Sequence, residues 1–424
     1  MSQLIYLDSQ ATTPLDPRVL SRMIPYLTMN FANAHSNHRL GRQISSTIEA
    51  ARAQVASTVN AQANEIVFTS GATESNNMAL KGVCHFYGDT KPSLAISRIE
   101  HKCVLETGRK LEAEGFRLHW IDVDEMGRIR IDQLKDILKQ HFDPTEEQSS
   151  LALVSIMTAN NEIGVIQPIR EIGQLCRDHG TLFHTDAAQA FGKIPIDVIK
   201  DNIDLMSISG HKIYGPKGVG ALYVRRERGR RVHLEPLMSG GGQEGGLRSG
   251  TLPVFLVVGL GAAAEIAQQD MKKDAIHYKN LFNIAQEKLM ALPEVRINGP
   301  IPDDTSPSQP FSKKRLLSNI NASFFGVEGE SLLLGLDDKV CLSSGSACTS
   351  SSLEPSHVLF ALGLDPELAH TAVRIGFSRF TTEDEVSQAC DMLTKKVREL
   401  RDLSPIWDMK TKGIDLKSVE WRHD

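Results

Sequence analysis

Short apolar runs alternate along the chain with stretches in which apolar residues recur at helical spacing. Continuous runs of this kind are typical of strands buried on both faces of a sheet, and the stretches between them are typical of crossover helices. We therefore predict an α/β fold with a seven-stranded, mainly parallel sheet covered by helices on both faces. The predicted strands are residues 66–68, 94–96, 118–121, 151–156, 182–184, 205–208 and 221–224.

The pattern changes after Thr251, where long helical stretches begin. An apolar run over residues 252–264 contains a proline and two glycines and is too short to cross a bilayer, so it predicts a buried helix. Two further strands are expected, at residues 319–325 and 340–342. Residues 299–315 carry four prolines among polar residues and predict a mobile surface loop.

A chain of 424 residues exceeds what one hydrophobic core usually supports. We predict a large domain of residues 15–262 and a smaller α+β domain of residues 1–14 and 263–424. Hydrophobic residues make up 41% of the chain and charged residues 23%, so packed domains are expected rather than disorder. The net charge of -5, without a block of one sign, argues against nucleic acid as a stable partner.

The N-terminus lacks the basic start and sustained apolar run of a secretory signal, and we expect no contact with a membrane. Six cysteines are few for this length, and no two of them have the close spacing of a zinc or redox site. We therefore predict a cytoplasmic protein with free thiols and no metal site of its own.

The most informative segment is residues 204–224, where a predicted strand opens into Ser209, Gly210, His211, Lys212 and a glycine-rich turn. A lysine just past a strand end, in surroundings that lower the pKa of its amine, can form a Schiff base with an aldehyde cofactor. The alternative is a solvated lysine without a chemical role, and this segment alone does not decide between the two.

Two other polar segments also follow predicted strands. Asp186 comes soon after residues 182–184, and a carboxylate there can hold a pyridine nitrogen protonated, which makes pyridoxal phosphate an electron sink. Residues 69–77 turn through Gly71 into a helix whose first amides can bind phosphate, with Thr73 adding a hydroxyl. Taken singly, Asp186 could cap a helix, and small polar residues open many helices without a ligand. Together with the lysine, they predict a site for pyridoxal phosphate.

A serine- and glycine-rich run surrounds Cys348. A cysteine in such a segment is expected to be exposed and mobile, where a nucleophilic thiolate is useful. Free cysteines are more often buried as small hydrophobic residues. The sequence gives no clear role to Cys103 or Cys341. Buried positions are expected for Cys84, Cys176 and Cys390.

The segments around Lys212 and Cys348 read SGHKIYGPKGVGALYV and SSGSACTSSSLEPS. With other stretches spread over nearly the whole chain, they resemble the group I cysteine desulfurases of the class V aminotransferase family, which serve iron–sulfur cluster assembly. The resemblance implies the fold type I of pyridoxal-phosphate enzymes. The other matching stretches are YLDSQATTPLDPRV, FTSGATESNN, IEHKCVLET, SIMTANNEIGV, FHTDAAQAFGKIPID, GLRSGTLPV and the tail from Ser404 to Trp421.

The resemblance implies a role for each residue that would face the cofactor. Lys212 would hold pyridoxal 5'-phosphate covalently, Asp186 would meet the pyridine nitrogen, and Gln189 would face the ring hydroxyl. His101 would stack on the ring and move protons. The phosphate would be held by Ala72, Thr73, Ser209 and His211, with Thr251 reaching in from the other subunit of a homodimer.

The same resemblance implies the reaction. Asn161, which also lies among the cofactor-binding positions, and Arg374 would bind the carboxylate of the substrate L-cysteine. Cys348 would take the sulfur as a persulfide, and the product would be L-alanine. The sulfur would pass to an iron–sulfur scaffold protein, which the C-terminal tail would bind. Other acceptors, such as a tRNA-thiolation relay, would also receive sulfur. Whether Cys348 also transiently shares a cluster with the scaffold is left open, as is whether Trp407 and Trp421 are interface anchors or pack back on the small domain.

Three features depart from the family pattern. Ala34 stands where proline is common, Gly245 stands where arginine is common, and residues 299–315 are inserted. Two other functions remain as alternatives. One is a related class V reaction such as selenocysteine lyase or an aminotransferase, which would share Lys212 but would not need a mobile Cys348. The other is a non-catalytic protein that binds a scaffold.

Overall fold

The computed structural model describes residues 4–146, 148–227, 229–303, 306, 308–344 and 356–414. Cys348 and residues 415–424 lie outside this described part. The chain forms two compact units. The large unit consists of Thr12–Asn161 and Val165–Ala275, and the small unit of Met1–Ala11, Glu162–Gly164 and Ile276–Asp424. The boundary predicted after residue 262 falls inside helix α8 (Val254–Met290).

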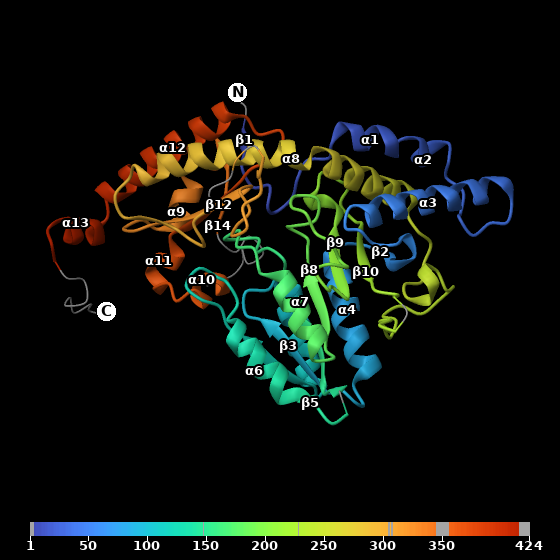
Figure 1. Cartoon of the computed structure of the whole chain (residues 1–424). Helices are drawn as coiled ribbons and strands as arrows, with labels where there is room; N and C mark the ends of the chain where they lie inside the picture. Colours follow the sequence, from blue (N-terminus) through green and yellow to red (C-terminus); the bar gives the residue numbers. More distant parts are fainter. Residues whose placement is uncertain are drawn as a thin grey trace. The chain divides into compact units, whose positions relative to one another are not determined.

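The large unit is built on a seven-stranded sheet (Figure 1). In order across the sheet, the strands are β2 (Ile66–Thr69), β10 (Gly220–Val224), β9 (Leu205–Ser209), β8 (Leu182–Asp186), β7 (Leu151–Ser155), β3 (Ser93–Ser97) and β4 (Arg117–Ile121). β10 is antiparallel to both of its neighbours, and the other neighbouring pairs are parallel. All residues of β3, β7, β9 and β10 are buried, as continuous apolar runs require. The predicted α/β fold with a seven-stranded, mainly parallel sheet is confirmed.

Two helices of the large unit position the site described below. α4 (Ala72–Tyr87) and α5 (Lys102–Ala113) pack together, and their apolar residues form one core cluster with residues of the sheet. The remaining elements of this unit are α1 (Pro17–Met23), α2 (Pro25–Thr28), α3 (Arg39–Ser57), η1 (Ala63–Glu65), α6 (Ile131–His141), the hairpin β5 (Phe142–Asp143) and β6 (Gln148–Ser149), α7 (Ile169–Asp178), η2 (Gly210–Lys212), η3 (Glu244–Gly246) and the first part of α8.

The small unit has its own core around an antiparallel sheet in the order β11 (Val295–Ile297), β12 (Asn319–Phe324), β15 (Ala372–Gly376) and β14 (Ser343–Ser344). β1 (Ile5–Tyr6) pairs in parallel with β13 (Val340–Cys341), which ties the N-terminus to this unit. Both strands predicted for this region are present. Its helices are the second part of α8, α9 (Gly329–Leu334), α10 (His357–Ala361), α11 (Pro366–His370), α12 (Glu383–Asp402) and α13 (Pro405–Thr411).

The last described helix, α13, is fastened to the small unit through Arg401 near the end of α12. The guanidinium of Arg401 lies 4.0 Å from the centre of the Trp407 ring and donates to three backbone carbonyl oxygens. A Cβ added at Gly326 would come within 3.1 Å of Trp407, which shows how closely the indole packs there. Of the two alternatives for Trp407, packing on the small unit is the one observed, whereas Trp421 lies outside the described residues.

Helix α8 contains the apolar run that was predicted to form a buried helix, and that prediction is confirmed. By length and composition alone α8 could cross a membrane, but 67% of its most apolar stretch is buried inside the structure. A helix that is mostly buried in this way is a core helix of the protein.

The proline-rich segment 299–315 is not a surface loop over its whole length. Arg315 is 1% exposed, donates to the carbonyl oxygens of Pro300 and Asn319, and lies over the ring of Phe282. Burying a guanidinium is tolerated only when its donors are satisfied, and backbone oxygens satisfy them here. The prediction was therefore wrong for the C-terminal end of this segment, because composition does not show which cation will fold inward.

Strand β8 carries a histidine that should make stability depend on pH. His184 is fully buried between Ser155 and Ser207, and burial lowers the pKa of its imidazole from 6.5 to about 3. As the pH falls below 6.5, the unfolded chain binds a proton that the folded chain excludes, so the free energy of unfolding should decrease from there toward pH 3. Urea unfolding should show that the free energy of unfolding is lower at about pH 5.5 than at about pH 7.5, with roughly 1 kcal/mol of the difference due to His184.

The variant His184→Gln removes the titrating group while leaving polar atoms for the two serines. It should be less stable at about pH 7.5, but its stability should change less between the two pH values than that of the wild type. An equal pH dependence in both proteins would show that His184 does not cause it.

Candidate active site

Three polar segments meet at one edge of the large sheet. In the strand register, Gly220 pairs with Thr69 on one side and with Ser209 on the other, and Asp186 pairs with Ser207 two residues earlier. The turn after Thr69, the turn after Ser209 and the end of β8 therefore lie side by side. The sequence predicted these segments to be strand ends of one sheet, and the register explains why they meet.

Gly220 allows the backbone of this edge to pack closely. A Cβ added at Gly220 would lie 2.7 Å from the Cα of Gly71 and 2.4 Å from the carbonyl oxygen of Ile208. Gly71 is the N-cap of α4, has a φ of 153° and leaves the helix start without a side-chain cap. The amides of Ala72 and Thr73 have no hydrogen-bond partner among the described residues, so the start of α4 offers donors to an anion.

The turn that carries Lys212 is clamped by the N-terminal segment of the large unit. The carbonyl oxygen of His211 accepts from the hydroxyl of Thr13 at 2.9 Å, and the same hydroxyl oxygen accepts from the N–H of Tyr214 at 2.9 Å. Thr12 Oγ1 lies 3.1 Å from His211 Nδ1. The turn is therefore held on both sides of Lys212, a residue that follows the end of β9 as predicted.

Positive charge is concentrated around this turn. Burial and the charges of Lys212, Lys217 and Lys193 lower the pKa of His211 to about 4. Burial and the charge of Lys212 likewise lower the pKa of Lys193 to about 7, against an opposing effect of Asp274. The lysines around this turn therefore create a positive potential that favours an anion.

Asp186 is held in one orientation at the end of β8. It is 5% exposed, its Oδ2 accepts from Asn76 Nδ2 at 2.7 Å, and its Oδ1 accepts from the N–H of Ala188 at 2.8 Å. Gln189 is buried three residues later and its Oε1 accepts from Lys193 at 3.2 Å. The bond to the N–H of Ala188 caps a turn, because no helix follows β8 directly, so the alternative of a helix cap was wrong. The second oxygen is held by Asn76 of α4.

His101 is the N-cap of α5 and is half-buried. Its Nδ1 accepts from the N–H of Cys103 at 3.2 Å and lies 3.0 Å from Cys103 Sγ. Asn161 is half-buried in the connection that follows β7. This connection starts next to the end of β8, because the N–H of Thr158 donates to the carbonyl oxygen of Asp186.

Sequence reasoning missed three residues of this site. Asn76 on α4 reaches Asp186, Cys103 contacts both Asn76 and His101, and Glu100 is fully buried beside them with an acceptor bond from the N–H of Met157. Burial raises the pKa of Glu100 well above its ordinary value, and the charge of Asp186 adds to this. Asn76 and Cys103 lie inside matching motifs, but nothing in the spacing shows that their side chains meet.

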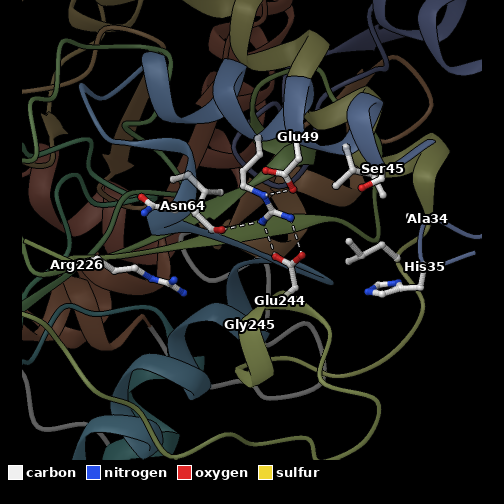
Figure 2. A pocket seen from close by; sticks show the side chains of 12 residues that line it. Ala34, His35, Ser45, Glu49, Asn64, Arg226, Glu244 and Gly245 are labelled. Carbon is white, nitrogen blue, oxygen red and sulfur yellow. Dashed lines mark hydrogen bonds and ion pairs between the residues drawn. The ribbon is translucent and has the colours of Figure 1, made fainter. Parts of the chain in front are cut away.

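Thr251 is exposed, and the loop before it borders a pocket of about 290 Å³ (Figure 2). Figure 2 shows Glu244 between Arg226, Asn64 and His35. Both Glu244 oxygens accept from Arg52 at 2.7 Å, and one also accepts from the N–H of Phe68. This buried ion pair fixes the loop.

Two of the departures from the family pattern, Ala34 and Gly245, line this same pocket. Gly245 has a φ of 64°, and a Cβ there would lie 3.6 Å from Arg226 Nη2. An arginine at this position would therefore place two cations together, which the glycine avoids.

In the small unit, Arg374 is a buried residue of β15. Its Nη2 lies 2.9 Å from Asp8 Oδ1, which also accepts from the hydroxyl of Ser343 at 2.9 Å. Asp8 thus holds the guanidinium in a fixed orientation. Arg374 belongs to the small unit, whereas Lys212 belongs to the large unit. Cys348, the expected sulfur acceptor, lies outside the described residues.

The five described cysteines are free. The prediction of buried positions for Cys84, Cys176 and Cys390 is confirmed. Burial raises the pKa of Cys84 and of Cys390 to about 12 and raises that of Cys176 further, so these thiols are inert.

Comparison with known proteins shows the family of the chain. Residues 5–389 match the family model "Aminotransferase class-V". The chain is 51% identical over 419 residues to cysteine desulfurase IscS of Rickettsia bellii, covering 98% of this chain and 97% of the relative. It is 50% identical over 421 residues to a probable mitochondrial cysteine desulfurase of Dictyostelium discoideum, covering 99% and 88%.

Solved structures give the same result. A NifS-like protein superposes with a TM-score of 0.82 at 35% identity, covering 94% of this chain and 99% of that one. A structure described as SspA in complex with cysteine superposes with a TM-score of 0.72 at 37% identity, covering 89% and 99%. The chain belongs to the class V aminotransferase family, and within it to the group I cysteine desulfurases.

Proposed function

We propose that this cysteine desulfurase binds pyridoxal 5'-phosphate in the large unit, with Lys212 as the covalent attachment point and Asp186 against the pyridine nitrogen. One observation carries the proposal. Strand register brings the turn of Lys212, the carboxylate of Asp186 and the open start of α4 to one edge of the sheet. An aldehyde, a basic ring nitrogen and a phosphate on one small molecule match these three groups.

The donor set supports a phosphate. The amides of Ala72 and Thr73 have no partner among the described residues, and His211 lies within the cluster of lysine charge. Ser209 ends the strand that pairs with Gly220, whose close approach to Gly71 brings the two turns together. We infer that Ala72, Thr73, Ser209 and His211 hold the phosphate and that Gln189 faces the ring hydroxyl.

When bound, pyridoxal phosphate supplies an electron-withdrawing ring that stabilises negative charge on the substrate carbon. Asp186 would keep the ring nitrogen protonated, and the amine of Lys212 would move a proton at the substrate α-carbon. His101 moves a second proton, while Asn161 and Arg374 bind the substrate carboxylate. A bidentate guanidinium suits that contact, and Asp8 already orients Arg374.

The thiolate of Cys348 attacks the sulfur of L-cysteine. The sulfur–sulfur bond forms as the carbon–sulfur bond breaks, the electron pair stays with carbon, and a proton returned to that carbon gives L-alanine. Cys348 is left as a persulfide. The relatives named as cysteine desulfurases support this reaction over the selenocysteine lyase and aminotransferase alternatives, and over a non-catalytic protein.

We further propose a homodimer in which Thr251 contributes to the phosphate site of the other subunit. Thr251 is exposed in the single chain. A run of exposed apolar side chains on and after α1 and α2 supports a protein interface in the large unit: Leu20, Ile24, Leu27, Met29 and Phe31. The iron–sulfur scaffold and other sulfur acceptors are the proposed partners, and the cytoplasm is the proposed location.

The proposal is tested by replacing Asp186. Asp186→Ala should bind pyridoxal phosphate more weakly and lower the turnover of cysteine on the order of 100-fold, because an unprotonated ring is a poor electron sink. Cofactor binding is measured by fluorescence titration, and alanine formation by amino-acid analysis.

Asp186→Glu is the matched control, because it keeps the carboxylate but shifts its position relative to Asn76. It should retain a larger share of cofactor affinity than Asp186→Ala. If Asp186→Ala keeps most of the wild-type rate, another group holds the ring nitrogen and the proposed assignment is wrong.

A further inference from the structure

Cys103 differs from the other described cysteines of the large unit. Cys84 and Cys176 are enclosed in apolar cores, whereas Cys103 is half-buried and its sulfur contacts two polar side chains. Asn76 Nδ2 lies 3.1 Å from Cys103 Sγ, and His101 Nδ1 lies 3.0 Å from it. The thiol is therefore part of a polar cluster at the site.

The contacts fix which atom of His101 carries a proton. The backbone N–H of Cys103 donates to His101 Nδ1, so this nitrogen is an acceptor and carries no hydrogen. In the neutral ring the proton is then on Nε2. The contact between Cys103 Sγ and Nδ1 must have the thiol as its donor, because the ring nitrogen has none to give.

The other partner of the sulfur is fixed in the same way. The carboxamide nitrogen of Asn76 has two hydrogens, of which one is donated to Asp186 Oδ2 at 2.7 Å. The second is directed to Cys103 Sγ, which accepts it. An amide held at both hydrogens cannot rotate its oxygen toward Asp186, where it would meet a like charge.

We propose that Cys103 is a positioning residue of the desulfurase reaction, which joins Asp186, Asn76 and His101 into one hydrogen-bonded chain. The sulfur holds the Asn76 donor on Asp186 at one end. At the other end its thiol donates to Nδ1 of His101, beside the backbone N–H that sets the Nε2–H form, and so fixes the tilt of the imidazole. This deepens the proposed function, since it rests on the roles of Asp186 and His101. It makes the orientation of the ring partner and of the proton-moving imidazole interdependent.

The test replaces Cys103 by alanine and by serine in the holoenzyme. Cys103→Ala should lower kcat about 10-fold, with KM for cysteine changed by less than about twofold, because orientation and not substrate binding is lost. The absorbance spectrum of the resting cofactor should shift, because Asn76 is released from one side. Cys103→Ser offers a donor and an acceptor at the same place and should recover most of kcat and the wild-type spectrum.

Thr107→Val is the matched control, because the Thr107 hydroxyl donates to the carbonyl oxygen of Cys103 one turn along α5 without touching the sulfur. It should leave kcat and the spectrum unchanged. The double variant Asn76→Ala with Cys103→Ala should lose less than the product of the two single losses, as members of one chain do.

Wild-type kcat and spectrum in Cys103→Ala would overturn the proposal. So would equal losses in the alanine and serine variants with a lowered melting temperature, since that marks a packing role alone. These outcomes are distinct from a failure of the proposed function, in which the wild-type protein itself would make no alanine from cysteine.

Discussion

Cys348→Ala should bind pyridoxal phosphate and cysteine but make almost no alanine. The groups proposed to hold the cofactor and the substrate carboxylate are untouched, so a spectral change on adding cysteine is expected. Breaking the carbon–sulfur bond needs a thiolate to take the sulfur, and that thiolate is gone. Stopped-flow absorbance measures the first event, and alanine analysis measures the second. The expected loss of turnover is on the order of 1000-fold or more.

Mass spectrometry should find one added sulfur on the peptide that contains Cys348 in wild-type protein treated with cysteine, and none there in the variant. Cys341→Ala is the matched control, because its thiol is the nearest in sequence among the described cysteines. Burial and the charge of Asp8 raise the pKa of the Cys341 thiol, so this thiol should neither accept sulfur nor restore turnover to Cys348→Ala. Cys341→Ala should therefore still gain the sulfur on Cys348. An added sulfur on any other cysteine of the wild type would contradict the assignment.

Lys212→Ala should lose both turnover and the absorbance of the covalently held cofactor while the fold is retained. The turn is clamped through backbone groups and the hydroxyl of Thr13, none of which the substitution removes. The expected loss is on the order of 1000-fold or more, since the amine both holds the cofactor and moves a proton. Circular dichroism and thermal melting check the fold, and the visible spectrum checks the attachment.

Lys212→Arg separates charge from chemistry. The guanidinium keeps the positive charge beside His211 but remains protonated and cannot attack an aldehyde. It should therefore be as inactive as the alanine variant while binding the phosphate more tightly. Substantial turnover in either variant would mean that a different amine, such as that of the neighbouring Lys193, holds the cofactor.

The strands of the large sheet were predictable because buried strands leave continuous apolar runs, and Lys212 and Asp186 were predictable because each follows such a run. The way in which the start of α4 comes beside them was not, since it depends on the antiparallel strand β10 lying between β2 and β9, which no local pattern shows. The same holds for the bond between Arg374 and Asp8, which are 366 residues apart in sequence.

The contacts made by side chains inside the matching motifs could not be predicted either. The motif around His101 shows that a cysteine is present at position 103, but its sulfur contacts Asn76 only because α4 and α5 pack together. Composition predicted a surface loop through Arg315, whereas backbone oxygens from two other positions make its burial tolerable. In both cases, the partner that decides the position of the side chain is distant in sequence.

The stacking of Trp407 under Arg401 determines how partner binding by the tail can be tested. A truncation that starts directly after Ser404 removes α13, uncovers the surface around Gly326 and leaves the Arg401 guanidinium without its aromatic partner. Any change in scaffold affinity would then mix lost contacts with a damaged docking surface. Ending the chain at Ile414 keeps this packing intact. Comparing the two endpoints assigns the affinity either to residues 405–414 or to the ten residues after Ile414.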